Sequence, residues 1–100
     1  MTVKQYLEST FDRNDPYQVR NRVTCADGYS VSIQGGTIYH YCCPRMHKNE
    51  YSKVELGYPS CADEEIIQYA ESLENPTQTV YGYVPIEVVE ALIKKHGGLV

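Results

Sequence analysis

The sequence predicts an α+β domain: an antiparallel, three- to four-stranded sheet arranged as a meander, with an N-terminal helix and two C-terminal helices packed on it. Three observations predict this class. Apolar residues recur every three or four positions near both ends of the chain, and they alternate with polar residues through the middle. Turn-forming pairs that contain glycine separate the alternating stretches. Because 100 residues lie near the common size of a domain, residues 1–100 are expected to form a single one.

The N-terminal helix is expected over about residues 2–11. Thr2 and Gln5 have the spacing of a capping box, in which each side chain bonds the backbone of the other residue. The apolar residues of this segment fall on one face of a helix. The Asn-Asp-Pro sequence at 14–16 should end the helix and turn the chain.

Alternating residues predict three or four strands in the middle of the chain, which cover residues 19–25, 29–34, 37–43 and 51–57. The Asp27-Gly28 pair is typical of a hairpin turn, because glycine tolerates the positive φ that such a turn needs. Gly35-Gly36 is interpreted as a second tight turn. It is not interpreted as a phosphate-binding loop, because no helix follows it whose N-terminus could hold an anion.

Two helices are expected after the strands, with an extended segment at 77–83 between them. The first would cover residues 61–74, with a serine N-cap and three acids in its first turn, where the helix dipole favours negative charge. An Asn-Pro pair should end it. Pro85 fits the first position of the last helix, and Gly97-Gly98 should end that helix.

Negative charge is concentrated in the C-terminal half. Between Lys53 and Lys94 the chain has no lysine or arginine and eight acids, which are Glu55, Asp63, Glu64, Glu65, Glu71, Glu74, Glu87 and Glu90. The first 53 residues carry seven bases and five acids, so the net charge of −4 combines a −8 block with a weakly basic half. A block of one sign steers encounters with the opposite sign over about a Debye length, ~8 Å at physiological salt. We therefore expect an acidic ridge on the helix over 61–74 that meets a basic partner.

The aromatic composition favours a binding surface, and the absence of long apolar runs argues against a membrane protein. The chain has ten tyrosines, one phenylalanine and no tryptophan. Tyrosine buries its ring while its hydroxyl stays hydrated, so it suits half-exposed sheet faces and binding surfaces. No stretch approaches the ~20 apolar residues of a membrane span, and the N-terminus lacks the apolar run of a signal peptide. The protein is expected to be soluble and cytoplasmic, with reduced cysteines and no membrane partner.

Cysteine and histidine residues offer a second class of site. A zinc site could draw on the soft ligands His40, Cys42, Cys43, Cys25, Cys61 and His47. No Cys-x-x-Cys pair is present, and Cys42 and Cys43 would point to opposite faces of a strand, so we expect no metal and no cofactor. No local motif pairs a thiol with a base, so no residue is expected to be catalytic. A zinc-stabilised regulatory or structural module is the first alternative, and a Cys-dependent enzyme is the second.

Direct nucleic-acid binding is not expected. Arg20 and Arg22 share one face of a predicted strand, which suits a small basic stripe. The isoelectric point of about 5.2 is nevertheless low for a nucleic-acid-binding domain. The acidic half would also repel a phosphate backbone.

The acid run at 61–74 and the tyrosines around it, Tyr58, Tyr69, Tyr81 and Tyr83, give the chain a resemblance to the anti-CRISPR proteins, which are small accessory proteins of phages and mobile elements. The resemblance is one of type over the whole chain and involves no shared motif. It implies a non-enzymatic inhibitor that mimics DNA on a basic, nucleic-acid-binding surface of a host protein, such as a Cas effector subunit. The weakly basic N-terminal half departs from a uniformly acidic mimic. The residues expected to contact the partner are Glu55, Asp63, Glu64, Glu65, Tyr69, Glu71, Glu74, Tyr81 and Tyr83.

Overall fold

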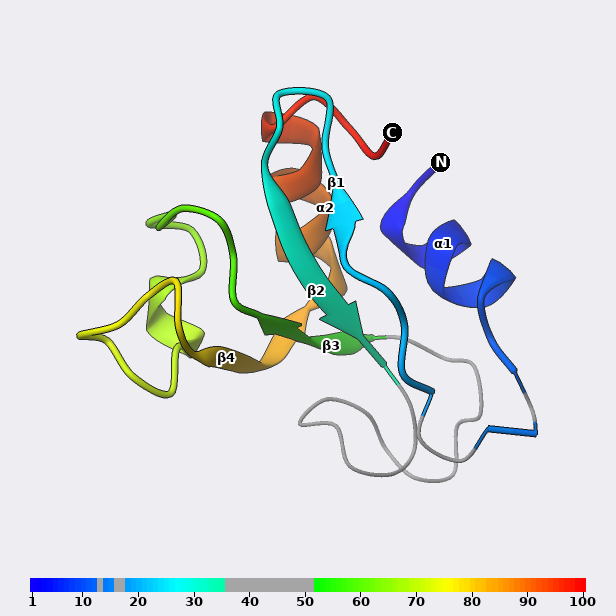
Figure 1. The fold of residues 1–100 in the computed structure, drawn as a ribbon, viewed down its shortest axis with the longest axis horizontal. Coiled ribbons are helices and arrows are strands. Elements are labelled where there is room, and N and C mark those ends of the chain that lie inside the picture. Colours follow the sequence, from blue (N-terminus) through cyan, green and yellow to red (C-terminus); the bar gives the residue numbers. More distant parts are fainter. Residues whose placement is uncertain (13, 16–17, 36–51) are drawn as a thin grey trace.

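Four antiparallel strands form one sheet, and each strand pairs with the next one along the chain (Figure 1). The computed structural model describes residues 1–12, 14–15, 18–35 and 52–100. Within them the elements are α1 (Val3–Ser9), β1 (Val23–Thr24), β2 (Ser30–Gln34), β3 (Lys53–Gly57), the 3-10 turn η1 (Ile67–Tyr69), β4 (Val80–Pro85) and α2 (Ile86–Lys95). The predicted α+β class with an antiparallel sheet is confirmed.

The strands themselves differ in part from the prediction. β2 and β3 lie within the strands predicted at 29–34 and 51–57. The strand predicted at 19–25 is reduced to the two residues of β1, because the backbone of Arg20 exchanges two hydrogen bonds of 2.8 Å with the side-chain amide of Gln34 and not with a strand. The strand predicted at 37–43 lies outside the described residues. The fourth strand is β4, from a segment expected only to be extended.

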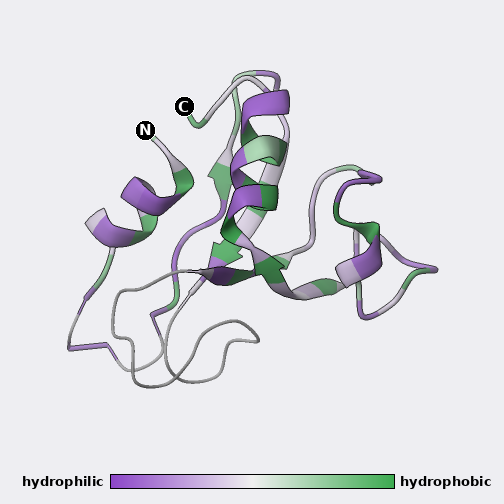
Figure 2. Cartoon of the chain, turned by 180° about the vertical axis from the view of Figure 1, so that it is seen from behind, coloured by the Kyte–Doolittle hydropathy of each residue, from purple (hydrophilic) through white to green (hydrophobic). Residues whose placement is uncertain are grey.

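One face of the sheet is apolar and packs against α2. The apolar residues of β2 and β3 are buried and alternate with polar ones through most of each strand, as in a half-buried sheet, and the last residue of each strand is buried as well. Figures 1 and 2 show α2 lying along this face, with α1 at the β1 side. The core joins sheet residues Val31, Ile33, Val54, Leu56, Tyr81 and Val84 to helix residues Val3, Leu7, Val89, Leu92 and Ile93.

Helix α1 begins at the predicted capping box. Thr2 Oγ1 accepts the backbone N–H of Gln5 at 3.0 Å, and Gln5 Oε1 accepts the backbone N–H of Thr2 at 2.8 Å. A second cap comes from α2, because the carboxylate of Glu90 accepts the N–H groups of Val3 at 2.8 Å and Lys4 at 3.2 Å. Glu90 therefore stabilises the N-terminus of α1, where the helix dipole favours an anion.

The helix predicted over 61–74 is not present. This segment is loop except for the single 3-10 turn η1, and at Ala70 the backbone is already extended, with ψ at 136°. The reason is that backbone groups needed for helical hydrogen bonds are paired with β4 instead. Ala70 forms a β-bridge with Tyr81, and the N–H of Glu71 donates to the carbonyl of Val80 at 3.0 Å. The segment also has no lysine or arginine to form i,i+4 pairs with its acids.

The last predicted helix is present, over Ile86–Lys95, and Pro85 is its N-cap, one position before the place predicted for it. The chain leaves the helix at His96, the C-cap, and Gly97 follows. Gly97 has a φ of +93°, which suits glycine, and a Cβ at this position would lie 2.8 Å from the Cβ of Ala26. The close approach lets the N–H of Asp27 donate to the carbonyl of His96 at 3.1 Å. The end of α2 is thereby held against the turn between β1 and β2. None of the described helices is long and apolar enough to cross a bilayer.

Candidate functional site

The longest described connection joins the paired strands β3 and β4 (Figure 1). We call residues 58–79 the acidic loop, because this 22-residue segment contains five acids and no lysine, arginine or histidine. Neighbouring antiparallel strands need only a two-residue turn between them. The length of the loop therefore has no explanation in the connectivity of the sheet.

The acidic loop is attached to the domain at several points. The side chain of Ile66 is completely buried in the core. Tyr81, also completely buried, donates its hydroxyl hydrogen to the carbonyl of Pro76. At the base of the loop, the N–H of Tyr58 donates to the carbonyl of Thr79 at 3.0 Å, and the Arg22 guanidinium donates to the carbonyl of Tyr58.

The residues expected to contact a partner divide into exposed and internal groups. Glu64, Glu71 and Glu74 of the loop are exposed, as is Tyr83 of β4. Glu55 and Tyr69 are half-buried, and Tyr69 packs against the core. Asp63 and Tyr81 are buried, so Tyr81 is a core residue and not a surface anchor. Leu73 was not among the residues expected to contact a partner, and it is 65% exposed among the acids of the loop.

Two exposed tyrosines adopt a backbone conformation that is uncommon for aromatic residues. Tyr58 has a φ of +51° and Tyr83 a φ of +54°. Tyr83 belongs to a bulge in β4, since Leu56 pairs with Tyr81 while Val54 pairs with Val84, so that one residue of β3 faces two of β4. Bulges and strained residues commonly direct side chains at functional sites.

The remaining two acids of the loop are bound to the end of α2. The ammonium of Lys95 lies 2.6 Å from Asp63 Oδ1 and 3.0 Å from Glu65 Oε1. The hydrogen bonds to Asp63 and then to Glu65 raise the pKa of Lys95, so this lysine stays charged. Asp63 and Glu65 therefore anchor the loop, and Glu64, Glu71 and Glu74 carry its outward charge.

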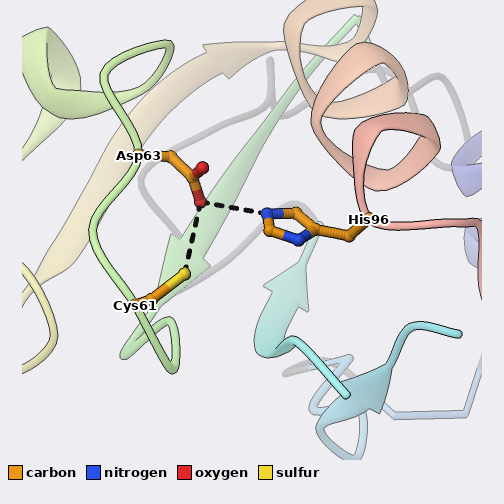
Figure 3. A group of neighbouring side chains, drawn as sticks. All are labelled: Cys61, Asp63 and His96. Carbon is orange, nitrogen blue, oxygen red and sulfur yellow. Dashed lines mark hydrogen bonds and ion pairs between the residues drawn. The ribbon is translucent and has the colours of Figure 1, made fainter. Parts of the chain in front are cut away.

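His96 joins Asp63 to the turn between β1 and β2. Figure 3 shows the side of this contact that faces Asp63. Its Nδ1 lies 2.7 Å from Asp27 Oδ2, and its Nε2 lies 3.2 Å from Asp63 Oδ2. The ring of Tyr29 stacks on the imidazole, with centroids 3.9 Å apart. Burial is the largest single influence on the pKa of His96 and lowers it, but the hydrogen bonds to Asp27 and Asp63 together outweigh burial, so the pKa is raised.

Cys61 lies beside this cluster, with its Sγ 3.9 Å from Asp63 Oδ2 (Figure 3). Desolvation, followed by the charge of Asp63, raises the pKa of the Cys61 thiol. A catalytic cysteine needs the opposite shift. Cys25 is buried and packs as a small apolar side chain, whereas Cys61 is exposed.

Comparison with known protein families, with curated proteins and with solved structures finds no match for this chain.

Several residues considered from the sequence have other roles or lie outside the described residues. Arg20 is buried, and its guanidinium donates to the carbonyls of Leu7 and Gly35, so it is structural. The candidate zinc ligands outside the described residues are His40, Cys42, Cys43 and His47. Sequence reasoning missed the cluster around His96, because its partners are 69 and 33 residues away in the chain. The one local signal was the Asp-Gly turn, which places a carboxylate at a sharp reversal of the chain.

Proposed function

We propose that this protein is a non-enzymatic binding protein that docks its acidic loop on a basic surface of a partner protein. The observation that carries the proposal is the exposure of Glu64, Glu71 and Glu74 on a 22-residue loop that the sheet does not need. The one regular element within residues 58–79, all of which the structure describes, is the short turn η1. Loops of this length with so little regular structure are uncommon in compact domains and usually serve a function.

The five acids of the loop fall into two groups, one that pairs with Lys95 and one that faces solvent, and this supports the proposal. Asp63 and Glu65 are both paired with the ammonium of Lys95 and hold the loop in place. The other three have no base near them in sequence, so their charges add at the surface. An acidic surface of this kind raises the rate of encounter with a basic partner, and the effect decreases with salt.

Apolar contacts would supply most of the affinity. Individual exposed ion pairs contribute only ~0–1 kcal/mol, whereas a few buried anchors dominate most interfaces. Leu73 is 65% exposed within the loop, and Tyr58 and Tyr83 are 52% and 55% exposed at and beside its base. These three side chains are the proposed anchors, with Tyr69 and Glu55 at the edge of the contact.

The proposed partner surface is one that ordinarily binds nucleic acid, because such surfaces are basic and shaped to accept a row of negative charges. The resemblance to anti-CRISPR proteins makes a subunit of a Cas effector the first candidate. In this role the loop would occupy the place of DNA and inhibit the effector in the cytoplasm of the host cell. The protein itself would not bind nucleic acid.

A competition assay tests the proposal. Purified Cas effector complexes of different types are incubated with a labelled DNA duplex and increasing amounts of this protein. We expect displacement of DNA from at least one effector, with an affinity that falls as salt is increased. Failure to bind or inhibit any effector would contradict the assignment of the partner.

A further inference from the structure

We propose that Cys61 Sγ, Asp63 Oδ2 and His96 Nε2 form a binding site for a divalent metal ion of the zinc class. The three atoms lie within 4.8 Å of one another, and they come from the start of the acidic loop and the end of α2 (Figure 3). Thiolate, imidazole and carboxylate together are a ligand set that zinc accepts. The site is distinct from the docking surface proposed above.

The distances are close to those of a tetrahedral site. Zinc–ligand bonds of ~2.0–2.3 Å place neighbouring ligand atoms ~3.3–3.8 Å apart. Asp63 Oδ2 already lies 3.2 Å from His96 Nε2 and 3.9 Å from Cys61 Sγ. Because Cys61 is exposed, rotation of its side chain can bring the sulfur to the remaining distance from His96.

The surroundings of His96 are those of a metal ligand. Its Nδ1 lies 2.7 Å from Asp27 Oδ2, which would fix the tautomer that leaves Nε2 free to bind a metal. Lys95 occupies Asp63 Oδ1 at 2.6 Å and leaves Oδ2 facing the histidine and the thiol. Metal binding would replace the proton between His96 Nε2 and Asp63 Oδ2 and would remove the proton of the Cys61 thiol.

Tyr29 provides an independent indication of a missing ligand. Its hydroxyl is the one buried side-chain polar atom without a hydrogen-bond partner in the described part of the chain, and the residue is only 4% exposed. Its ring stacks on His96, and the charges of Asp63 and Cys61 act on its hydroxyl, where they add to burial in raising its pKa. Buried hydroxyls normally have a partner. Water in the fourth position of the metal would supply one.

Cobalt titration of the reduced protein tests the proposal, because Co²⁺ bound to a thiolate has an intense charge-transfer absorption. We expect one Co²⁺ per chain with this absorption, its displacement by Zn²⁺, and a higher melting temperature with either metal. Cys61→Ser should abolish the charge-transfer band, and Asp27→Asn should weaken binding by ~10–100-fold through the orientation of His96. Cys61 is exposed, so the serine variant is expected to fold, and its circular dichroism checks this.

The control is Cys42→Ser/Cys43→Ser, which removes the two cysteines that are consecutive in the sequence and retains Cys61. This variant should bind cobalt with unchanged stoichiometry and spectrum. The proposal is overturned if the wild-type protein shows no thiolate–cobalt band. It is equally overturned if the band survives Cys61→Ser, and loss of the band in the control would assign the thiolate to Cys42 or Cys43. Neither result bears on the docking surface, whose exposed acids are not ligands.

Discussion

The ammonium of Lys95 lies 2.6 Å from the buried carboxylate of Asp63, and this pair fastens the acidic loop to the end of α2. It separates the acids of the loop into those that hold it and those that face solvent. The same carboxylate reaches His96 through its other oxygen. Loop anchoring and the proposed metal site therefore share Asp63.

Asp63→Asn should destabilise the metal-free protein far more than Glu65→Gln, although both residues contact Lys95. The side chain of Asp63 is 4% exposed, and its removal leaves Lys95 and His96 without their shared anion, which should cost about 1–3 kcal/mol. Glu65 is 45% exposed, and an exposed pair contributes little. Urea unfolding in chelator measures both variants. Equal losses would show that Asp63 is not the anchor.

His96 should stabilise the metal-free fold at acidic and neutral pH and lose this effect at higher pH. Its pKa in the fold is above the usual 6.5, because hydrogen bonds to Asp27 and Asp63 outweigh burial. The stabilisation is therefore complete below the unfolded pKa and decreases as pH rises through the folded pKa. Among the neighbouring groups, the raised pKa values keep Lys95 charged and Tyr29 and Cys61 neutral over this range. Hydrogen bonds from the backbone of Tyr29 and from His96 lower the pKa of Asp27, so this carboxylate stays charged as well.

An NMR titration in chelator identifies the His96 resonance by its loss in His96→Gln and measures its pKa. The difference in unfolding free energy between wild type and this variant should decrease with pH over the same interval. His40 and His47 are present in both proteins, so their titration cancels. If the difference in unfolding free energy is constant or increases with pH, His96 does not form stabilising charged contacts with Asp27 and Asp63.

Gly97→Ala should cost more stability than Gly98→Ala. Both glycines have φ near +90°, so alanine is strained by about 1 kcal/mol at either position. At Gly97 the new methyl group would also lie 2.8 Å from the Cβ of Ala26, whereas nothing lies within 4 Å at Gly98. Thermal unfolding should rank the two variants accordingly. Equal effects would mean that the end of α2 does not press on the turn that carries Asp27.

Tyr81→Phe should loosen the acidic loop while leaving the core packed. The substitution keeps the buried ring and removes the hydroxyl that donates to the carbonyl of Pro76, at a cost of about 0.5–1.5 kcal/mol. Hydrogen exchange should become faster in the loop and stay unchanged in β2. Unchanged exchange in the loop would show that this hydrogen bond does not hold it.

Local sequence signals predicted the local parts of the fold. The Thr2/Gln5 capping box, the strands at β2 and β3, and helix α2 each depend on neighbours within a few residues, and each is present. The prediction of a helix over 61–74 was wrong because the acids and apolar residues of this segment make contacts with distant parts of the chain. Asp63 is bound by Lys95, and Ile66 enters the core.

The acidic loop and the cluster around His96 were less predictable than the fold, because they too depend on contacts between distant residues. Composition indicated an acidic surface, but only the structure separates exposed Glu71 from buried Asp63. The contact between Asp27 and His96 spans 69 residues and depends on Gly97 bringing α2 to the turn. No spacing in the sequence encodes such a pair.

The role of the acidic loop is tested most directly by two charge-matched variants. Glu71→Lys/Glu74→Lys reverses two exposed acids of the loop, and Glu8→Lys/Glu87→Lys reverses two exposed acids on α1 and α2. Both change the net charge equally, so any difference between them reports the position of the charge.

The decisive measurement is the association rate of each variant with an effector that the wild-type protein displaces from DNA, at low and at high salt. We predict that the loop variant associates at least ~10-fold more slowly than wild type and loses most of its salt dependence, while the control variant keeps both. Equal association rates for the two variants would contradict the assignment of the acidic loop as the docking surface.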